Sequence, residues 1–281
     1  MYAKKLDEPG KANLKNVPTD ETGDLSKEQG AEKLAVLRAE LGELQQLCYG
    51  AGQNGVLVVL QGRDTSGKDG TLKIIAGAMN PVGVSIATFK VPTERELAHD
   101  FLWRVHAETP GKGRITFFNR SHYEDVLVVR VHGYAPEKIW RRRYEHINAF
   151  EELLRDAGVI VVKFYLHISK GEQEERLMAR ENDPSKAWKL SPGDWAERKL
   201  WDDYSAAYED ALGKCATPHA PWFVVPADHK WFRNVAVAEA LVETLRPYKK
   251  AWAEALETAG KEQKAALQTM RDQGAAPPIK G

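Results

Sequence analysis

Short apolar runs alternate with amphipathic segments along most of this chain. Five runs are apolar at nearly every position, at residues 56–60, 84–89, 115–118, 159–168 and 222–226. Strands that are apolar on both sides of the pleat are typical of parallel sheets covered by helices on both faces. The segments between them have helical periodicity, so the pattern predicts an α/β fold around a parallel sheet of about five strands.

The helical segments carry recognisable boundaries. Ser26 and Gln29 fit a capping box, and the helix that they open has leucines at helical spacing, at Leu34, Leu37, Leu41, Leu44 and Leu47. A second helix is predicted to open at Pro136 and to stop at Gly158. We expect both helices to cover the sheet.

Both ends of the chain lack a hydrophobic period. Residues 1–25 are polar and predict an extended arm or a disordered tail. Residues 251–281 are rich in Ala, Lys, Glu and Gln, which predicts a solvated helix followed by a loose tail. The remaining residues, 26–250, are predicted to form one domain.

A phosphate-binding loop is predicted directly after the first apolar run. Its sequence GRDTSGKD, residues 62–69, has the spacing G-x-x-x-x-G-K, in which backbone N–H groups and the lysine converge on phosphate oxygens. A buried strand precedes it and a helix follows, so the helix N-terminus would attract the anion. The alternative is a tight turn with a solvated lysine. The candidate phosphate-binding residues are Gly62, Thr65, Ser66, Gly67, Lys68, Asp69, Gly70 and Thr71.

The loop carries two carboxylates, at Asp64 and Asp69. Asp69 stands where a P-loop commonly has the Ser or Thr that ligates Mg²⁺. Because carboxylates repel a polyanion unless a divalent cation bridges them, we expect Asp64 to ligate Mg²⁺, with Mn²⁺ as a substitute. Asp69 is either a second ligand or a helix cap.

A second polar loop follows the strand at residues 115–118. Its position after a parallel strand places it at the carboxyl edge of the sheet, where open α/β sheets bind ligands. Arg120 is predicted to grip an acceptor phosphate, and Glu124 or Asp125 to hold metal or orient the acceptor. The alternative is that these charges cap the next helix. The candidate residues are Asn119, Arg120, Ser121, Tyr123, Glu124 and Asp125.

Residues 169–195 are predicted to form a basic helical lid. Arg176 and Arg180 lie four residues apart, on one helical face, and Lys189 follows. Such a lid would close positive charge over a phosphoryl group and exclude water. The alternative is an exposed face whose arginines are paired with nearby glutamates.

The last strand is followed by Trp231 and Arg233 at the same sheet edge. Arg233 is predicted to meet a phosphate. The ring of Trp231 would stack on a base or, alternatively, belong to the core.

Composition narrows the class of protein. The 40 basic and 40 acidic residues balance, whereas nucleic-acid binders carry a basic excess, so no nucleic-acid partner is expected. Cys48 and Cys215 lack metal-ligand spacing, which fits a reducing compartment. No run approaches the roughly 18 apolar residues of a membrane span, and the N-terminus lacks an apolar leader. We therefore expect a cytoplasmic protein without a membrane partner.

Taken together, the motifs QGRDTSGKDGT, VPTERELAHDFLWRVH, FNRSHYEDVLVVRV, FYLHISKGEQEERL and HKWFRN resemble the second polyphosphate kinase family, from about residue 30 to 248. The resemblance implies a three-layer, thymidylate-kinase-like P-loop kinase fold with a helical lid. It also implies reversible, Mg²⁺-dependent phosphoryl transfer between inorganic polyphosphate and nucleotides, in a homodimer or homotetramer. The matching catalytic positions are Asp64, Lys68, Arg120, Arg176 and Arg180.

The motif FNRSHYEDV resembles the branch that accepts nucleoside monophosphates as well as diphosphates. AMP and ADP are the expected acceptors, with GMP and GDP as further candidates. Members with Asp before the arginine differ from this chain, which has Asn119, so metal ligation there is not expected. Two other readings stay open: an ATP-driven nucleoside monophosphate kinase and a noncatalytic nucleotide-binding or assembly protein.

Overall fold

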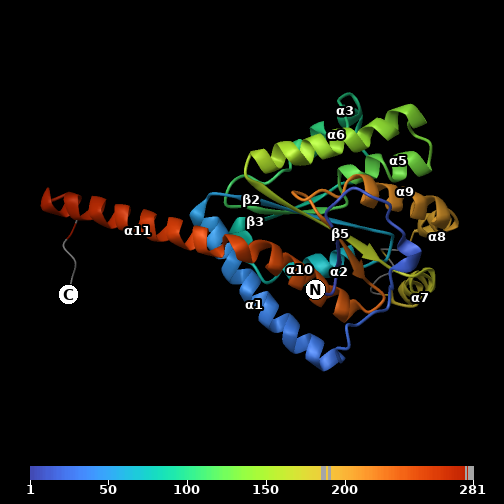
Figure 1. Ribbon diagram of the computed structural model, residues 1–281, viewed down its shortest axis with the longest axis horizontal. Helices are drawn as coiled ribbons and strands as arrows, with labels where there is room; N and C mark the ends of the chain where they lie inside the picture. The colour runs from blue at the N-terminus through green and yellow to red at the C-terminus, as the bar shows by residue number, and fades with distance from the viewer. Residues whose placement is uncertain (185–187, 189–190, 276, 278–281) are drawn as a thin grey trace.

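The protein is a three-layer α/β structure built around one six-stranded sheet (Figure 1). The computed structural model describes residues 1–184, 188, 191–275 and 277. The strand order is β1-β6-β5-β2-β4-β3. Five strands are parallel, as predicted, and β1 pairs antiparallel to β6 at one edge. The strands are β1 (Lys4–Leu6), β2 (Gly55–Gly62), β3 (Val84–Thr88), β4 (Ile115–Asn119), β5 (Val159–His167) and β6 (Trp222–Pro226).

Helices cover both faces of the sheet. One layer contains α1 (Lys27–Ala51), α2 (Lys68–Ala76) and α10 (Lys230–Leu245), and the opposite layer contains α6 (Glu137–Asp156) and α9 (Trp201–Lys214). The capping box at Ser26 and Gln29 is confirmed. The remaining helices are α3 (Glu94–Leu97), α4 (Trp103–His106), α5 (Val128–Val131), α7 (Lys170–Glu181), α8 (Pro192–Lys199) and α11 (Lys249–Asp272).

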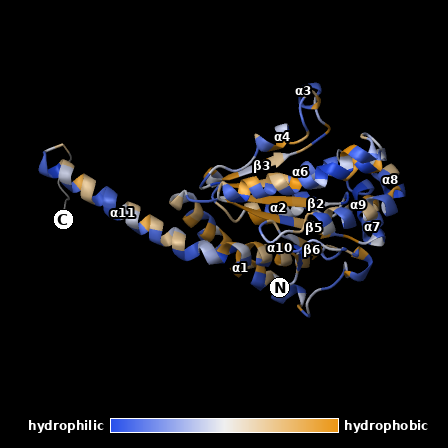
Figure 2. Ribbon diagram, turned by 45° about the horizontal axis from the view of Figure 1, so that its top comes forward, coloured by the Kyte–Doolittle hydropathy of each residue, from blue (hydrophilic) through white to orange (hydrophobic). Residues whose placement is uncertain are grey.

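The central strand β2 explains why its sequence is apolar throughout. Val56, Val58 and Leu60 pack into the core beneath α1, α2 and α10, whereas Leu57 and Val59 pack into the core beneath α6 and α9. Side chains that alternate across a strand reach both faces, so each face needs its own apolar set. Figure 2 shows this apolar centre between more polar outer helices.

The prediction of coverage on both faces is wrong for residues 84–89. Strand β3 pairs only with β4 and forms the second edge of the sheet. Ile86 is 55% exposed there, and the strand has one buried residue, Ala87. The apolar run at residues 84–89 therefore predicts a strand correctly, but it does not predict that the strand is central in the sheet.

The N-terminal residues 1–25 pack on the body of the protein. Strand β1 lies beside β6, and Leu14 is buried in the core beneath α9. Two hydrogen bonds fix the segment further: the N–H of Tyr2 donates to Glu239 over 2.7 Å, and the hydroxyl of Thr19 donates to Asp228 over 2.7 Å. This segment has no hydrophobic period. It is held instead by pairing at the edge of the sheet, by buried Leu14 and by these two hydrogen bonds.

The topology gathers the candidate residues at one edge. Strands β2, β4, β5 and β6 run parallel, so the segments that follow them emerge at the same side of the sheet. These segments carry the phosphate loop, the second polar loop, helix α7 and the start of α10. Within the described part of the chain, no helix is long and apolar enough to cross a membrane.

Candidate active site

The phosphate loop connects the end of β2 to the start of α2. Gly67 has a φ of 99°, and a Cβ atom there would lie 1.8 Å from Nη1 of Arg233. Both the backbone conformation and the space therefore require glycine. Thr65 also lies in the left-handed region, with a φ of 61°. The loop therefore curves tightly from the end of β2 into the N-terminus of α2, which is a favourable position for an anion.

Lys68 lies buried beneath this curve. Its Nζ donates to the carbonyl oxygens of Gly62 over 2.7 Å and Arg63 over 3.2 Å. Burial, reinforced by the positive charge of Arg120, lowers the pKa of Lys68 to about 8. Within the described residues, the buried hydroxyls of Thr65 and Ser66 have no hydrogen-bond partner. The loop thus has a cation and donors available for an anion.

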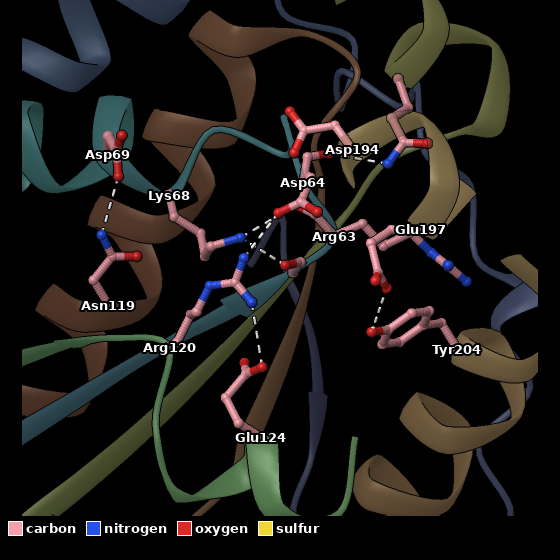
Figure 3. Close-up of polar contacts among 12 residues, drawn as sticks. Arg63, Asp64, Lys68, Asp69, Asn119, Arg120, Glu124, Asp194, Glu197 and Tyr204 are labelled. Atoms are coloured by element: carbon pink, nitrogen blue, oxygen red, sulfur yellow. Dashed lines mark hydrogen bonds and ion pairs between the residues drawn. The ribbon is translucent and has the colours of Figure 1, made fainter. Parts of the chain in front are cut away.

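Arg120 joins the phosphate loop to the second polar loop (Figure 3). Its Nη2 lies 2.9 Å from Oδ1 of Asp64, and its Nη1 lies 3.3 Å from Oε2 of Glu124. Burial opposes the charge of Arg120, but Glu124 and Asp64 outweigh burial and raise its pKa. Arg120 has a φ of 63°, a strained conformation for a non-glycine residue. Asp64 and Glu124 therefore lie on either side of Arg120 and are both paired with it.

Asp69 lies in the first turn of α2, one residue after Lys68. The N-cap of this helix is Gly67, which makes no side-chain cap bond, so the helix-cap alternative for Asp69 is wrong. Its Oδ1 instead accepts a hydrogen bond of 3.0 Å from the amide of Asn119. This bond ties the first turn of α2 to the end of β4 beside the loop (Figure 3).

Two arginines donate hydrogen bonds to the backbone of the phosphate loop. Arg176 donates to the carbonyl oxygens of Thr65, Ala227 and Asp228 over 2.9, 2.7 and 2.6 Å, and its side chain is 7% exposed. Arg233 donates to the carbonyl of Ser66 over 3.2 Å. Burial and then the charge of Arg176 lower the pKa of Arg233 to about 10. In this structure both arginines brace backbone.

Arg180 lies one helical turn beyond Arg176 on α7. It pairs with Asp194 of α8 over 2.8 Å, and both side chains are partly exposed. Both residues line the cavity above the phosphate loop. The predicted lid residue Lys189 lies outside the described residues. Arg180 is therefore placed to face a ligand in that cavity.

Two cavities meet at the centre of the site. The larger, about 400 Å³, lies above the phosphate loop and is lined by cationic side chains that include Lys68, Arg180 and Lys230. The smaller, about 40 Å³, lies between Glu124 and helices α8 and α9. Asp64 and Arg120 line both cavities. One carboxylate and one guanidinium therefore form the boundary between two compartments.

The smaller cavity contains side chains that sequence reasoning missed. Arg63 stacks on Trp201, with Cζ 3.7 Å from the ring centroid, and donates to Ser205 over 2.6 Å. The hydroxyl of Tyr204 donates to Glu197 over 2.7 Å. These residues belong to ordinary amphipathic helices, so no motif or spacing pointed to them. Arg63 lies inside the loop motif but at a position the motif leaves open.

Three predicted site residues point away from the phosphate loop. The Oγ of Ser121 accepts from the amide of Gln61 over 3.0 Å, and the hydroxyl of Tyr123 donates to buried Glu151 over 2.9 Å. Asp125 pairs with Arg143 of α6 over 2.9 Å. Burial raises the pKa of Asp125 to about 6, against the opposing effect of Arg143.

The base-stacking alternative for Trp231 also differs from its observed position. A Cβ atom on Gly30 of α1 would lie 2.4 Å from the ring of Trp231. The ring therefore packs against the helix at a point where only glycine leaves room. This favours the reading of Trp231 as a core aromatic.

The described residues contain no cluster of three or more His, Cys, Asp or Glu side chains that could hold a metal ion. Mg²⁺ commonly takes one or two carboxylates and completes its shell with water and substrate phosphates. Asp64 and Glu124, on either side of Arg120, suit such a partial set. The donor groups present therefore fit a Mg²⁺ ion that arrives with phosphate, held chiefly by Asp64.

Known proteins resemble the chain over most of its length. The family model described as "Polyphosphate kinase 2 (PPK2)" matches residues 24–252. An "AMP/ADP-polyphosphate phosphotransferase" from Meiothermus ruber is 50% identical over 84% of this chain and 89% of the relative. An "ADP-polyphosphate phosphotransferase" from Rhodopseudomonas palustris is 40% identical over 82% of this chain and 83% of the relative.

A solved structure agrees with the sequence comparisons. Polyphosphate kinase 2 from Arthrobacter aurescens TC1 superimposes with a TM-score of 0.82 at 45% identity, covering 84% of this chain and 86% of that one. The expected P-loop kinase fold is confirmed by this likeness and by the three-layer architecture. The chain belongs to the polyphosphate kinase 2 family.

Proposed function

We propose that this protein transfers phosphoryl groups reversibly between inorganic polyphosphate and nucleoside mono- and diphosphates. The observation that carries the proposal is the cavity of about 400 Å³ above the phosphate loop, which Asp64, Lys68, Arg120 and Arg180 line together. A phosphotransferase must hold two phosphate compounds with their reacting ends adjacent, and one cavity lined by these charges could receive both ends.

The residues divide into donor and acceptor groups. The loop N–H groups and Lys68 would bind the end of polyphosphate, and Asp64 would hold the Mg²⁺ that neutralises charge on the phosphates. Arg120 and Arg180 would orient the acceptor phosphate for in-line attack. A general base is unnecessary because the acceptor phosphate is already ionised at neutral pH. Positioning and charge neutralisation would supply most of the rate enhancement.

The acceptor range is proposed from the relatives and the second loop. The Meiothermus ruber relative is named for AMP and ADP, and the Rhodopseudomonas palustris relative for ADP. At 50% identity over most of both chains, the first relative supports AMP and ADP as acceptors here. GMP and GDP remain further candidates for the same site. Free, buried Cys48 and Cys215 accord with the proposed cytoplasmic location.

The test is nucleotide formation by purified protein with Mg²⁺, AMP or ADP as acceptor, and polyphosphate or ATP as donor. We expect ADP and ATP to form from AMP with polyphosphate, measured by ion-exchange chromatography. AMP conversion that requires ATP as donor would instead identify a nucleoside monophosphate kinase. No product with either donor would favour a noncatalytic binding protein.

Two variants test the assigned roles against a matched control. Lys68→Ala should lower kcat about 10³-fold because it removes a charge aimed at the transferring phosphate. Asp64→Asn should act through the metal and raise the Mg²⁺ concentration needed for half-maximal rate. Lys73→Ala removes an exposed lysine on the same helix α2 and should leave the rate unchanged. Near-normal turnover by Lys68→Ala or Asp64→Asn would contradict the assignment.

A further inference from the structure

A charged pair lies in the core between the sheet and helix α6. Lys163 is in the middle of β5 and Glu151 is on α6, and both side chains are 0% exposed. The Nζ of Lys163 lies 2.5 Å from Oε2 of Glu151. It also donates to the hydroxyl of Tyr123 over 2.9 Å and to the carbonyl of Cys215 over 2.7 Å. All three protons of the ammonium group therefore have an acceptor.

Stability alone does not account for this pair. Val161 and Tyr165, the neighbours of Lys163 on the same face of β5, belong to the apolar core. Removing two charges from water is costly, and replacing a buried ion pair by apolar side chains is often neutral or stabilising. A role in fixing the position of neighbouring groups accounts for the pair better.

Glu151 binds two consecutive residues of the second polar loop. Its Oε1 accepts from the hydroxyl of Tyr123 over 2.9 Å and lies 3.1 Å from Nε2 of His122. Both loop side chains are fully buried. Burial opposes the charge of Glu151, but Lys163 and His122 outweigh burial and lower its pKa. One ionised carboxylate therefore fixes two adjacent side chains of the loop.

The two fixed residues lie between the two charged residues that line the site. Arg120 precedes them, Glu124 follows them, and these two side chains pair over 3.3 Å. Arg120 has a φ of 63°, and such a conformation persists only where the surrounding contacts over-determine it. Ser121 is held as well, by the hydrogen bond of 3.0 Å from Gln61. The contacts beneath the loop therefore fix the backbone that carries the Arg120 guanidinium.

We infer that Glu151 and Lys163 are positioning residues that hold the second polar loop so that Arg120 keeps the orientation needed for phosphoryl transfer. The inference rests on the proposed function, in which Arg120 orients the acceptor phosphate. Both members of the pair are fully buried and lie outside the lining of the cavity above the phosphate loop, so they act on the reaction through the loop. A small displacement of an orienting group lowers the rate strongly.

Tyr123→Phe tests the link between the pair and the loop, because it removes one hydroxyl and keeps both charges. We expect kcat with AMP and polyphosphate to fall about tenfold. The KM for polyphosphate should stay within about twofold of the wild-type value, because the phosphate loop and Lys68 are unchanged. Rates are measured at a temperature where thermal unfolding shows each variant to be fully folded.

Tyr144→Phe is the matched control. Tyr144 is buried in the same core on α6, and its hydroxyl accepts from Arg130 over 3.3 Å. This variant loses a buried hydroxyl that has no contact with the second polar loop, so it should keep the wild-type kcat. An equal loss of kcat in Tyr144→Phe and Tyr123→Phe would overturn the inference, because loss of any buried hydroxyl would then suffice.

A double variant separates positioning from stability. Glu151→Gln alone leaves a buried charge without a carboxylate partner, whereas Glu151→Gln combined with Lys163→Met removes both charges at similar size. We expect the double variant to melt closer to the wild type than Glu151→Gln does, and yet to show a kcat at least about tenfold below the wild type. A double variant with wild-type kcat would refute the positioning role.

The route through Arg120 is tested by combining variants. In an Arg120→Ala background, Tyr123→Phe should lower the residual kcat by less than about twofold, because the group that it helps to position is absent. A tenfold loss in both backgrounds would refute action through Arg120. Wild-type kcat in Tyr123→Phe would overturn the inference and leave the proposed function standing, whereas a wild-type protein that forms no nucleotide would overturn both.

Discussion

Arg176→Ala tests whether the first lid arginine braces the phosphate loop or acts on the substrate. In the structure its guanidinium donates to the carbonyls of Thr65, Ala227 and Asp228 and pairs with Glu172 over 2.6 Å. A brace stabilises the folded protein in the absence of substrate, whereas a mobile lid residue does not. The two readings therefore differ in unfolding free energy as well as in activity.

The expected loss of unfolding free energy in Arg176→Ala follows from the four contacts of this side chain and from two effects that reduce their net contribution. Each charged hydrogen bond contributes roughly 1.5–3 kcal/mol, which sets an upper bound well above 5 kcal/mol. Arg176 lines the larger cavity, so water can reach the vacated carbonyls. Its removal also relieves repulsion with Arg233. We expect a net loss of about 3 kcal/mol, which corresponds to a melting temperature lower by about 6–12 °C.

The assay is thermal and denaturant unfolding of the substrate-free protein, with Arg180→Ala as the comparison. Arg180 lies one turn away and pairs with Asp194 in a partly exposed position, so its loss should cost about 1 kcal/mol. Both variants should lose activity. Equal unfolding curves for Arg176→Ala and the wild type, with activity lost, would refute the brace and restore the lid role.

Three further predictions concern the loop and the core. Because burial lowers the pKa of Lys68 to about 8, polyphosphate affinity measured by calorimetry should fall above pH 8 as the free protein loses that charge; a flat profile from pH 7 to 9.5 would contradict this. Glu151→Gln should destabilise by about 3–5 kcal/mol in denaturant unfolding, since it leaves the buried charge of Lys163, 2.5 Å away, without a carboxylate partner. Gly67→Ala should abolish activity and lower the melting temperature, because its Cβ would collide with Arg233; wild-type behaviour would disprove the close packing.

Local features were predictable from sequence where a motif fixes its own geometry. The strand, loop and helix around Lys68 are contiguous, so their relation needs no distant contact. Arg120 could also be placed at the same edge of the sheet as the phosphate loop, because the carboxyl ends of parallel strands lie at one edge. These predictions depended on short-range spacing and on one general rule of α/β topology.

Other features depended on tertiary contacts that a pattern does not encode. Glu124 and Asp125 are adjacent in a 3-10 turn, yet one faces Arg120 and the other faces Arg143. From the sequence, the guanidinium N–H groups of Arg176 could donate to solvent, substrate or backbone. Only the tertiary structure determines that they donate to backbone carbonyls. Strand β1 is three residues long, too short to show a period of two.

That short strand also protects the protein from self-association through its sheet. Strand β6 is buried along its whole length, and without Lys4–Leu6 its outer backbone groups would form an open edge. Open apolar edges serve as templates for strands of other chains and lead to aggregation. The first six residues therefore cover the edge of the sheet. A fusion or truncation that displaces them would expose the edge of β6 to pairing with strands of other chains and to aggregation.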